Sequence, residues 1–424
     1  MSYLMLAVTL IGFAISLPVA AALGLAGIAG LWLSGANMLI LPKEIFSAID
    51  KFPLAAIPFF ILAGNIMERG GISSRLVALA KAMVGGLPGG LAATCVLTCM
   101  MFAAVSGSSI ATTFAIGAIL IPALVKHGYP RGYAGALQAT SAELGIILPP
   151  SIPLILYGVA AEVSIGQLFI AAIGPGLFVG TVMLIFTLLY CRYKGYGQND
   201  HVDRLPVAHA FLAALPALSL PIIILGGIYT GITTPTEASI IAVFAALIVG
   251  MGIYREVKIR DIPVILHKSV ISVAMIMIII ACAGLFSYMI TRAGVPDQLG
   301  RFLTEHFESK LIFLIVLNIG LLLIGMILET NSAVLVLTPI IAPVAIQIGV
   351  DPVHLGLIMI VALAIGMVTP PMAVNVFAAC TVGKIPFDHV VPRLIPMIGM
   401  MILCLIVITY VPEISLFMRD FIYK

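Results

Sequence analysis

Two short clusters of oxygen-bearing side chains interrupt apolar stretches of this sequence. The first consists of Ser106, Gly107, Ser108 and Ser109, and the second of Glu329, Thr330, Asn331 and Ser332. Neutral hydroxyl and carbonyl oxygens are suitable ligands for a hard cation such as Na+, and they bind it weakly enough for release. The same groups can also cap the helix that follows or hydrogen-bond a neighbouring helix, and both roles can hold together. The partial positive charge at such a helix start also attracts an anionic substrate group.

A double proline occurs once in each half of the chain. The two pairs are Pro149-Pro150, after Gly145, and Pro370-Pro371, after Gly366 at the same spacing. Proline has no N–H to donate and clashes with the preceding turn, so nearby carbonyl oxygens lose their helical partners. Inside a membrane such oxygens need another partner, which is either a bound cation or a covering neighbour. The matched prolines and the matched clusters together favour cation binding.

Ionisable side chains inside apolar segments are candidates for function by default. Glu143, two residues before Gly145, and Glu329 in the second cluster are the best placed. Glu143 could equally pair with a basic neighbour. Glu237 follows Thr234 at an expected helix start, where an ordinary capping role is at least as plausible.

The amino-acid composition indicates which kind of secondary structure holds these residues. Of 424 residues, 62% are hydrophobic and 9% are charged, against roughly 25% charged in a soluble domain. The apolar content suffices for about a dozen bilayer crossings, so we predict an all-helical polytopic membrane protein. A net charge of +3 spread over separate loops argues against nucleic acid as a partner. Membrane lipid is the expected surrounding.

Apolar runs separated by polar loops locate the crossings. We predict them near residues 3–17, 19–36, 54–68, 132–161, 167–190, 210–229, 236–254, 269–290, 353–380 and 394–411. Stretches 90–125 and 311–348 carry the two clusters near their middle and are predicted to be re-entrant hairpins. Basic residues favour cytoplasmic loops, here 191–206, 255–268 and the segment with Arg69, Arg75 and Lys81. Both termini would then be periplasmic.

The chain also contains an internal repeat. A gapless offset of 221 aligns Pro122 with Pro343, Gly128 with Gly349, Gly135 with Gly356, Gly145 with Gly366, Pro149 with Pro370, Pro150 with Pro371, and Pro175 with Pro396. The predicted repeats are 1–200 and 205–424, each with one hairpin and one Pro-Pro-broken helix. An odd number of crossings per repeat inverts the second copy, and inverted repeats are typical of secondary transporters with midplane sites. An old duplication in a channel or scaffold is the alternative.

The residues resemble the large membrane subunit, of DctM or SiaM type, of the tripartite ATP-independent periplasmic (TRAP) transporters. The stretches that carry this resemblance are Ile57–Gly64 with Arg69–Gly71, Ser106–Ser109, Leu148–Pro153, Gly226–Gly231 with Thr234–Ala238, and Thr369–Pro371. The resemblance covers essentially the whole chain. It implies Na+-coupled uptake of an organic acid anion, such as sialic acid or a C4-dicarboxylate, across the bacterial inner membrane by an elevator-type movement. It also implies a periplasmic substrate-binding protein and a separate small membrane subunit of about four helices.

The resemblance also assigns candidate site residues. Carried over by position, the Na+ ligands are Ser106, Ser108, Gly145, Leu148 and Pro149 in the first half, and Thr330, Asn331, Gly366, Thr369 and Met372 in the second. The second cluster lacks the Ser-Gly-Ser of the first, which leaves its ligands less sharply defined. We expect the anion to bind between the two clusters, at Ser106, Gly107, Ser108, Ser109, Glu329, Thr330, Asn331 and Ser332.

Two competing functions make different demands on the sequence. An intramembrane serine hydrolase would use Ser106 or Ser108 as nucleophile and needs a base within reach. All seven histidines, at 127, 201, 209, 267, 306, 354 and 389, lie in expected loops or at span ends, so we expect no enzyme. A passive channel is the other alternative, and it would conduct without a binding protein.

Overall fold

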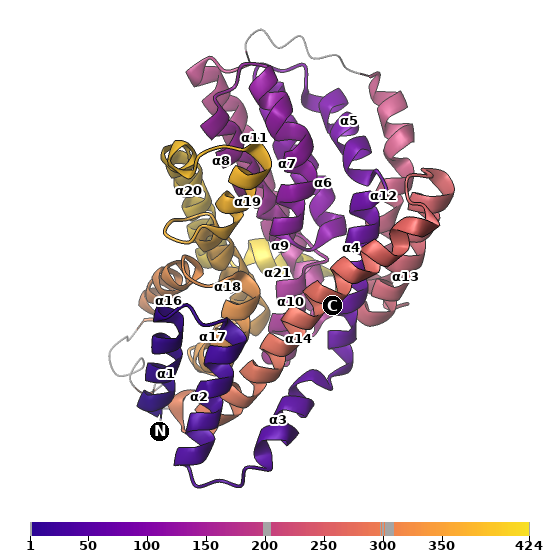
Figure 1. Cartoon of the computed structure of the whole chain (residues 1–424). Coiled ribbons are helices and arrows are strands. Elements are labelled where there is room, and N and C mark those ends of the chain that lie inside the picture. Colours follow the sequence, from indigo (N-terminus) through magenta and orange to yellow (C-terminus); the bar gives the residue numbers. More distant parts are fainter. Residues whose placement is uncertain (1, 198–204, 297, 299–300, 302–308, 424) are drawn as a thin grey trace.

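The polypeptide folds almost entirely into helices (Figure 1). A computed structural model describes residues 2–197, 205–296, 298, 301 and 309–423. Within these residues, eight helices are long and apolar enough to cross a membrane, or up to nine if Arg131–Ile147 and Ile152–Ala160, bent by 43°, form one span. The all-helical membrane fold expected from the composition is confirmed.

The helices of the first half are α1 (Ser2–Ala14), α2 (Val19–Leu33), α3 (Ile40–Ile49), η1 (Phe52–Ala55), α4 (Ala56–Arg69), α5 (Ile72–Val84), α6 (Gly90–Ser106), α7 (Ser109–Lys126), α8 (Arg131–Ala142), α9 (Leu144–Ile147), α10 (Ile152–Ala160) and α11 (Ile165–Lys194). Those of the second half are α12 (Val207–Tyr229), α13 (Pro235–Leu247), η2 (Ile248–Ile253), η3 (Ile259–Asp261), α14 (Ile262–Arg292), α16 (Lys310–Gly325), α17 (Thr330–Gln347), α18 (Pro352–Met367), α19 (Val374–Gly383), α20 (Phe387–Tyr410) and α21 (Glu413–Ile422).

Both halves contain the same order of elements around the two clusters. A pair of helices, α6 and α7 or α16 and α17, meets at a cluster and is followed by a broken helix, α8–α10 or α18–α19. A long helix with an internal proline, α11 or α20, then follows. These elements occupy the residues expected for the hairpins and broken helices. Membrane re-entry and the division into repeats 1–200 and 205–424 stay predictions.

Three helices were not expected from the sequence. They are α3, α5 and α21, and in consequence Arg75 and Lys81 lie on α5 rather than in a loop. Lys268, also expected in a loop, lies inside α14. Helix α5 buries Ile72, Leu76 and Ala80 along one face, so it is an amphipathic helix. Polar residues on its other face interrupt the continuous apolar run by which a membrane crossing is recognised in a sequence.

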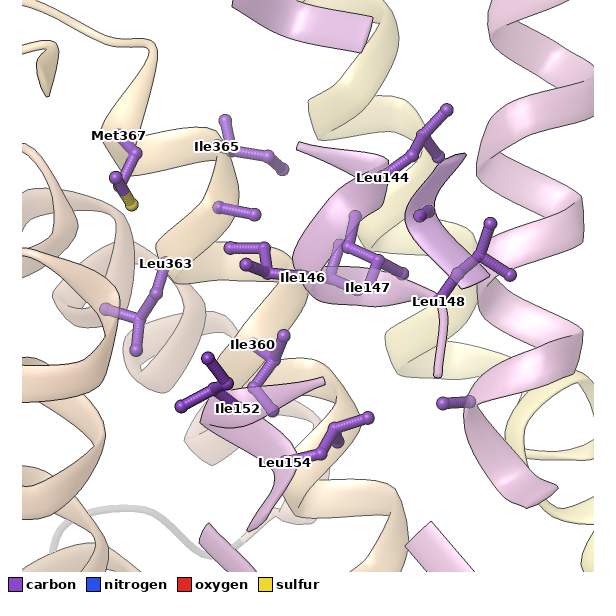
Figure 2. Close-up of a cluster of buried hydrophobic side chains, with 14 of the residues drawn as sticks. Leu144, Ile146, Ile147, Leu148, Ile152, Leu154, Ile360, Leu363, Ile365 and Met367 are labelled. Atoms are coloured by element: carbon purple, nitrogen blue, oxygen red, sulfur yellow. The ribbon is translucent and has the colours of Figure 1, made fainter. Parts of the chain in front are cut away.

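The broken helices form the most buried part of the molecule. Every residue of α9 is buried, as are nearly all residues of α8 and α18. Figure 2 shows apolar side chains of α9, α10 and α18, including Ile146, Ile152 and Ile360, that gather around the first break. By contrast, α12 and α14 expose many large apolar side chains. Such faces suit contact with lipid, while the clusters and breaks lie within the protein.

One ion pair fastens the last helix to the second broken helix. The Arg419 guanidinium on α21 lies 2.7 Å from Oδ2 of Asp351, and Oδ1 of Asp351 accepts hydrogen bonds from the backbone N–H groups of Val353 and His354 at the start of α18. Burial alone would raise the pKa of Asp351, but these hydrogen bonds lower the pKa below its ordinary value of 3.8. The fold therefore stabilises the ionised form of the Asp351 side chain.

We expect Asp351→Asn, which keeps the cap but removes the ion pair, to lower the free energy of unfolding by about 1 kcal/mol at neutral pH. Asp351→Ala removes both and should cost about 2 kcal/mol. Because the folded pKa is depressed, the ionised carboxylate stabilises the protein above its ordinary pKa, and this contribution is lost as the pH falls below about 4. Thermal unfolding in detergent measures the effect. If the difference in unfolding temperature between wild type and Asp351→Asn did not become smaller in acid, this assignment would be contradicted.

Candidate functional site

The first cluster forms the tip between α6 and α7. Helix α6 ends at Ser106, Gly107 adopts a left-handed φ of +65°, and Ser108 caps α7 by accepting a hydrogen bond from the N–H of Ala111 at 3.4 Å. The carbonyl oxygen of Ser108 accepts hydrogen bonds from the hydroxyls of Ser106 (3.2 Å) and Thr112 (2.8 Å). Ser108 therefore has the helix-capping role that was considered for this cluster beside cation binding.

This tip packs directly against the first double proline. The N–H of Ile152 donates to the carbonyl oxygen of Gly107 at 3.4 Å, and a Cβ on Gly107 would lie 2.8 Å from the carbonyl oxygen of Pro150. A Cβ on Gly145 would lie 2.9 Å from the carbonyl oxygen of Ser108. Only glycine permits these approaches. The structure thus brings Ser106, Ser108 and Gly145 together.

The remaining two predicted ligands of the first half lie in the break itself. Leu148 follows α9 with an extended backbone, and Pro149 lies in the bend that begins there. Among the described residues, no backbone N–H donates to their carbonyl oxygens. These oxygens match the expectation that the double proline frees carbonyls from helical bonding.

The second cluster caps α17 with a carboxylate instead of a hydroxyl. Glu329 accepts hydrogen bonds from the backbone N–H of Asn331 (3.1 Å) and of Ser332 (3.3 Å), and from the side-chain amide of Asn331 (2.6 Å). The Asn331 carbonyl oxygen Oδ1 is buried and accepts no hydrogen bond from the described residues. Buried polar atoms are normally partnered, so this oxygen is available to a partner that the described residues do not supply. Thr330 donates to the Met367 sulfur at 3.0 Å.

The second break lies against the end of α16, close to the second tip. The N–H of Met372 donates to the carbonyl oxygen of Met326 at 3.2 Å. A Cβ on Gly366 would lie 2.4 Å from the carbonyl carbon of Gly325, so the two helix backbones are in contact. Thr369 donates its hydroxyl proton to the carbonyl of Ile365 at 2.7 Å. The predicted ligands of the second half are therefore neighbours of one tip and one break, as in the first half.

A cavity of about 530 Å³ lies between the two tips. It is lined by Ser106, Gly107, Ser108 and Ser109 from the first cluster and by Glu329, Thr330 and Asn331 from the second. Ser332 is buried and contributes its backbone N–H to Glu329, but it does not line the cavity. The structure thus brings all but one of the predicted substrate residues to a single space.

The opposite wall of this cavity was missed by the sequence analysis. It is formed by Ile61, Gly64, Asn65 and Glu68 of α4 and by Lys268, Ser272 and Ile276 of α14. Asn65 and Glu68 interrupt an apolar run, which is the signal that could have indicated them. The two helices are joined beside the cavity by a hydrogen bond from Asn65 to Ser269 (2.8 Å) and by the ion pair of Lys268 with Glu68 (2.7 Å).

Glu143 belongs to a buried network that connects the two halves of the chain. Its Oε1 accepts a hydrogen bond from the side-chain amide of Asn375 on α19 at 2.8 Å, and Asn375 also donates to the carbonyl of Ala139 and accepts from Thr113. Its second oxygen accepts no hydrogen bond within the described part of the chain. The partner is thus an amide rather than the basic neighbour that the sequence analysis allowed.

The cavity offers little to a hydrolase. No histidine occurs among the described residues that line it, and the Ser106 hydroxyl donates to a backbone carbonyl instead of a base. His201 and His306 lie outside the described residues. The hydroxyls and the side-chain amide that line the cavity are groups that coordinate or hydrogen-bond, so the arrangement suits binding.

The sequence matches a known family over nearly its full length. The family model described as "Tripartite ATP-independent periplasmic transporter, DctM component" matches residues 4–414. The isethionate TRAP transporter permease protein DctMQ of Oleidesulfovibrio alaskensis is 40% identical over 405 residues, which are 95% of this chain and 64% of that protein. The C4-dicarboxylate TRAP transporter large permease protein DctM of Pseudomonas aeruginosa is 39% identical over 373 residues, covering 88% of this chain and 87% of the relative.

A solved structure has a similar fold. The crystal structure of the Alcanivorax borkumensis YdaH transporter superposes with a TM-score of 0.62 at 16% sequence identity, over 90% of this chain and 87% of that one. This similarity concerns the fold alone.

Proposed function

Because this chain belongs to the family of DctM components of the tripartite ATP-independent periplasmic transporters, we propose that it is a large permease subunit that couples Na+ entry to the import of an organic acid anion. The main support for Na+ coupling is that each oxygen-rich tip contacts a double-proline break. Each pair gathers neutral oxygens, as a releasable Na+ site requires. Two Na+ sites, one in each half, are the consequence.

The substrate we propose is a small organic acid anion that binds in the cavity between the tips. The two relatives with the highest identity given above are named for isethionate and for C4-dicarboxylates, which are small acids, and a C4-dicarboxylate or sialic acid is our expectation for this chain. A cavity of about 530 Å³ accommodates molecules of this size. Helix starts at Ser109 and Thr330 direct partial positive charge toward it.

The proposed assembly includes two further proteins in and at the bacterial inner membrane. A periplasmic binding protein delivers the acid, and a small membrane subunit of about four helices completes the scaffold. The exposed apolar faces of α12 and α14 are available to that subunit and to lipid. We propose that both hairpins and both broken helices move together past α4 and α14, as an elevator, when the sites are loaded. Periplasmic termini and an inverted repeat belong to the same proposal.

Removal of a single ligand oxygen tests the Na+ sites. We expect Ser106→Ala and Thr369→Ala each to raise the Na+ concentration that gives half-maximal uptake by about tenfold, because each removes one neutral group near a proposed ion. The measurement is uptake of labelled succinate or isethionate by the reconstituted complex over a range of Na+ concentrations. Ser219→Ala on α12, whose hydroxyl bonds only its own helix, is the matched control. The assignment would be refuted if Ser106→Ala and Ser219→Ala needed the same Na+ concentration for half-maximal uptake.

A further inference from the structure

The cavity between the tips contains one cationic side chain among the described residues that line it. This is Lys268 on α14, whose Nζ lies 2.7 Å from Oε2 of Glu68 on α4. Both residues line the cavity wall that faces the tips. The Lys268 side chain is 57% exposed and that of Glu68 is 28% exposed, so a solute in the cavity has access to the pair.

The charges around the cavity do not favour an anion while this pair is closed. Glu68 and Glu329 both line the space, and Lys268 is paired with the first of them. An organic acid placed here would meet carboxylates and no free ammonium. Hydroxyl groups of the first tip can donate hydrogen bonds to it, but they supply no formal charge. An anion therefore needs a cation from the wall as well as the Na+ ions at the tips.

We propose that Lys268 is the residue that binds the acidic group of the substrate, and that Glu68 holds its ammonium in the empty cavity. The lysine side chain is a flexible stem with a compact charge and three donors, so it can exchange one carboxylate for another. When substrate enters, Nζ leaves Glu68 and contacts the carboxylate or sulfonate. This inference rests on the proposed transport function and names the group that selects acids.

The alternative for this pair is a purely structural one, in which it fastens α4 to α14. A hydrogen bond from Asn65 to Ser269 already joins the same two helices one turn away. Breaking a partly exposed ion pair costs little stability. The two roles are separated by exchanging the partners, because the double variant Glu68→Lys/Lys268→Glu restores an ion pair but moves the ammonium to α4.

The test is uptake of labelled succinate and isethionate by the complex reconstituted with its small subunit and binding protein, under an inward Na+ gradient. We expect Lys268→Met to lower the initial rate at limiting substrate by about ten- to a hundredfold, and Lys268→Arg to retain most of it. The exchanged double variant should melt near the wild-type temperature and still transport as poorly as Lys268→Met. Arg69→Ala is the control, since it breaks the Arg69–Asp261 ion pair at the same end of α4 outside the cavity, and it should transport normally.

Each result decides between the proposals. Wild-type rates in Lys268→Met, or transport restored by the exchanged double variant, would overturn the role of Lys268 while Na+-coupled import stands. Wild-type protein that imports neither acid under the gradient would count against the proposed substrate class, and the role of Lys268 falls with it. Melting temperatures of the purified variants separate a folding defect from a binding defect.

Discussion

Replacing Gly366 with alanine is expected to separate α18 from α16 and to abolish function at the second break. The added Cβ would lie 2.4 Å from the carbonyl carbon and 2.5 Å from the Cα of Gly325. These are backbone atoms, so no side chain can rotate away, and one helix has to shift. Overpacking of this kind costs about 1–3 kcal/mol. Such a shift would also pull Met372 from its hydrogen bond to Met326.

A glycine on the contacted helix, α16, provides the control for this prediction. At Gly320 on α16, nothing lies within 4 Å of an added Cβ. Gly320→Ala should be neutral or stabilise the protein by up to about 1 kcal/mol through helix propensity. We therefore expect a lower melting temperature, and loss of Na+-dependent uptake, only for Gly366→Ala. Equal melting temperatures for both variants would contradict the close contact of the two helices.

Replacing Asn375 with leucine is expected to destabilise the protein by about 2–4 kcal/mol. Its side chain bonds Glu143, the carbonyl of Ala139 and the hydroxyl of Thr113, and all of these groups are buried. Leucine has a similar volume but leaves each of them without this partner, and an unpaired buried polar group costs about 1–3 kcal/mol. The melting temperature of the purified variant measures the loss.

A double-mutant cycle tests whether Glu143 is the principal partner. Glu143→Met combined with Asn375→Leu removes both members of the pair, and replacing both partners by apolar groups costs less than removing one. We expect the double variant to be more stable than the sum of the two single losses predicts. Thr381→Ala, on the exposed face of α19 with a bond only within its own helix, should leave the melting temperature unchanged. Additive effects of the two single substitutions would show that the network is not coupled.

Features that are local in the chain could be predicted from the sequence. The clusters at Ser106 and Glu329 and the breaks at Pro149 and Pro370 were visible because proline chemistry and polar interruptions act on adjacent residues. The all-helical fold followed from composition in the same way. Helices α5 and α21 could not be predicted in this way, because polar residues on one face of each helix interrupt the apolar runs that indicate a crossing.

Features that depend on long-range contacts were not accessible from one sequence. Asn375 meets Glu143 across 232 residues, and Lys268 meets Glu68 across 200. From the sequence, Lys268 is expected to be a loop residue that sets orientation, as lysines near span ends usually do. Its place on the cavity wall results from the packing of α14 against α4, and nothing in the residues around it encodes that neighbour.

The measurement that most directly tests Na+-coupled import is uptake of labelled succinate or isethionate by proteoliposomes that contain this chain with its small subunit and binding protein. With an inward Na+ gradient, the acid should accumulate above its external concentration. Replacing external Na+ by K+ at the same ionic strength should reduce the initial rate to the level of protein-free vesicles. Accumulation that persists in K+, or flux that runs only down the gradient of the acid whatever the cation, would contradict the coupling.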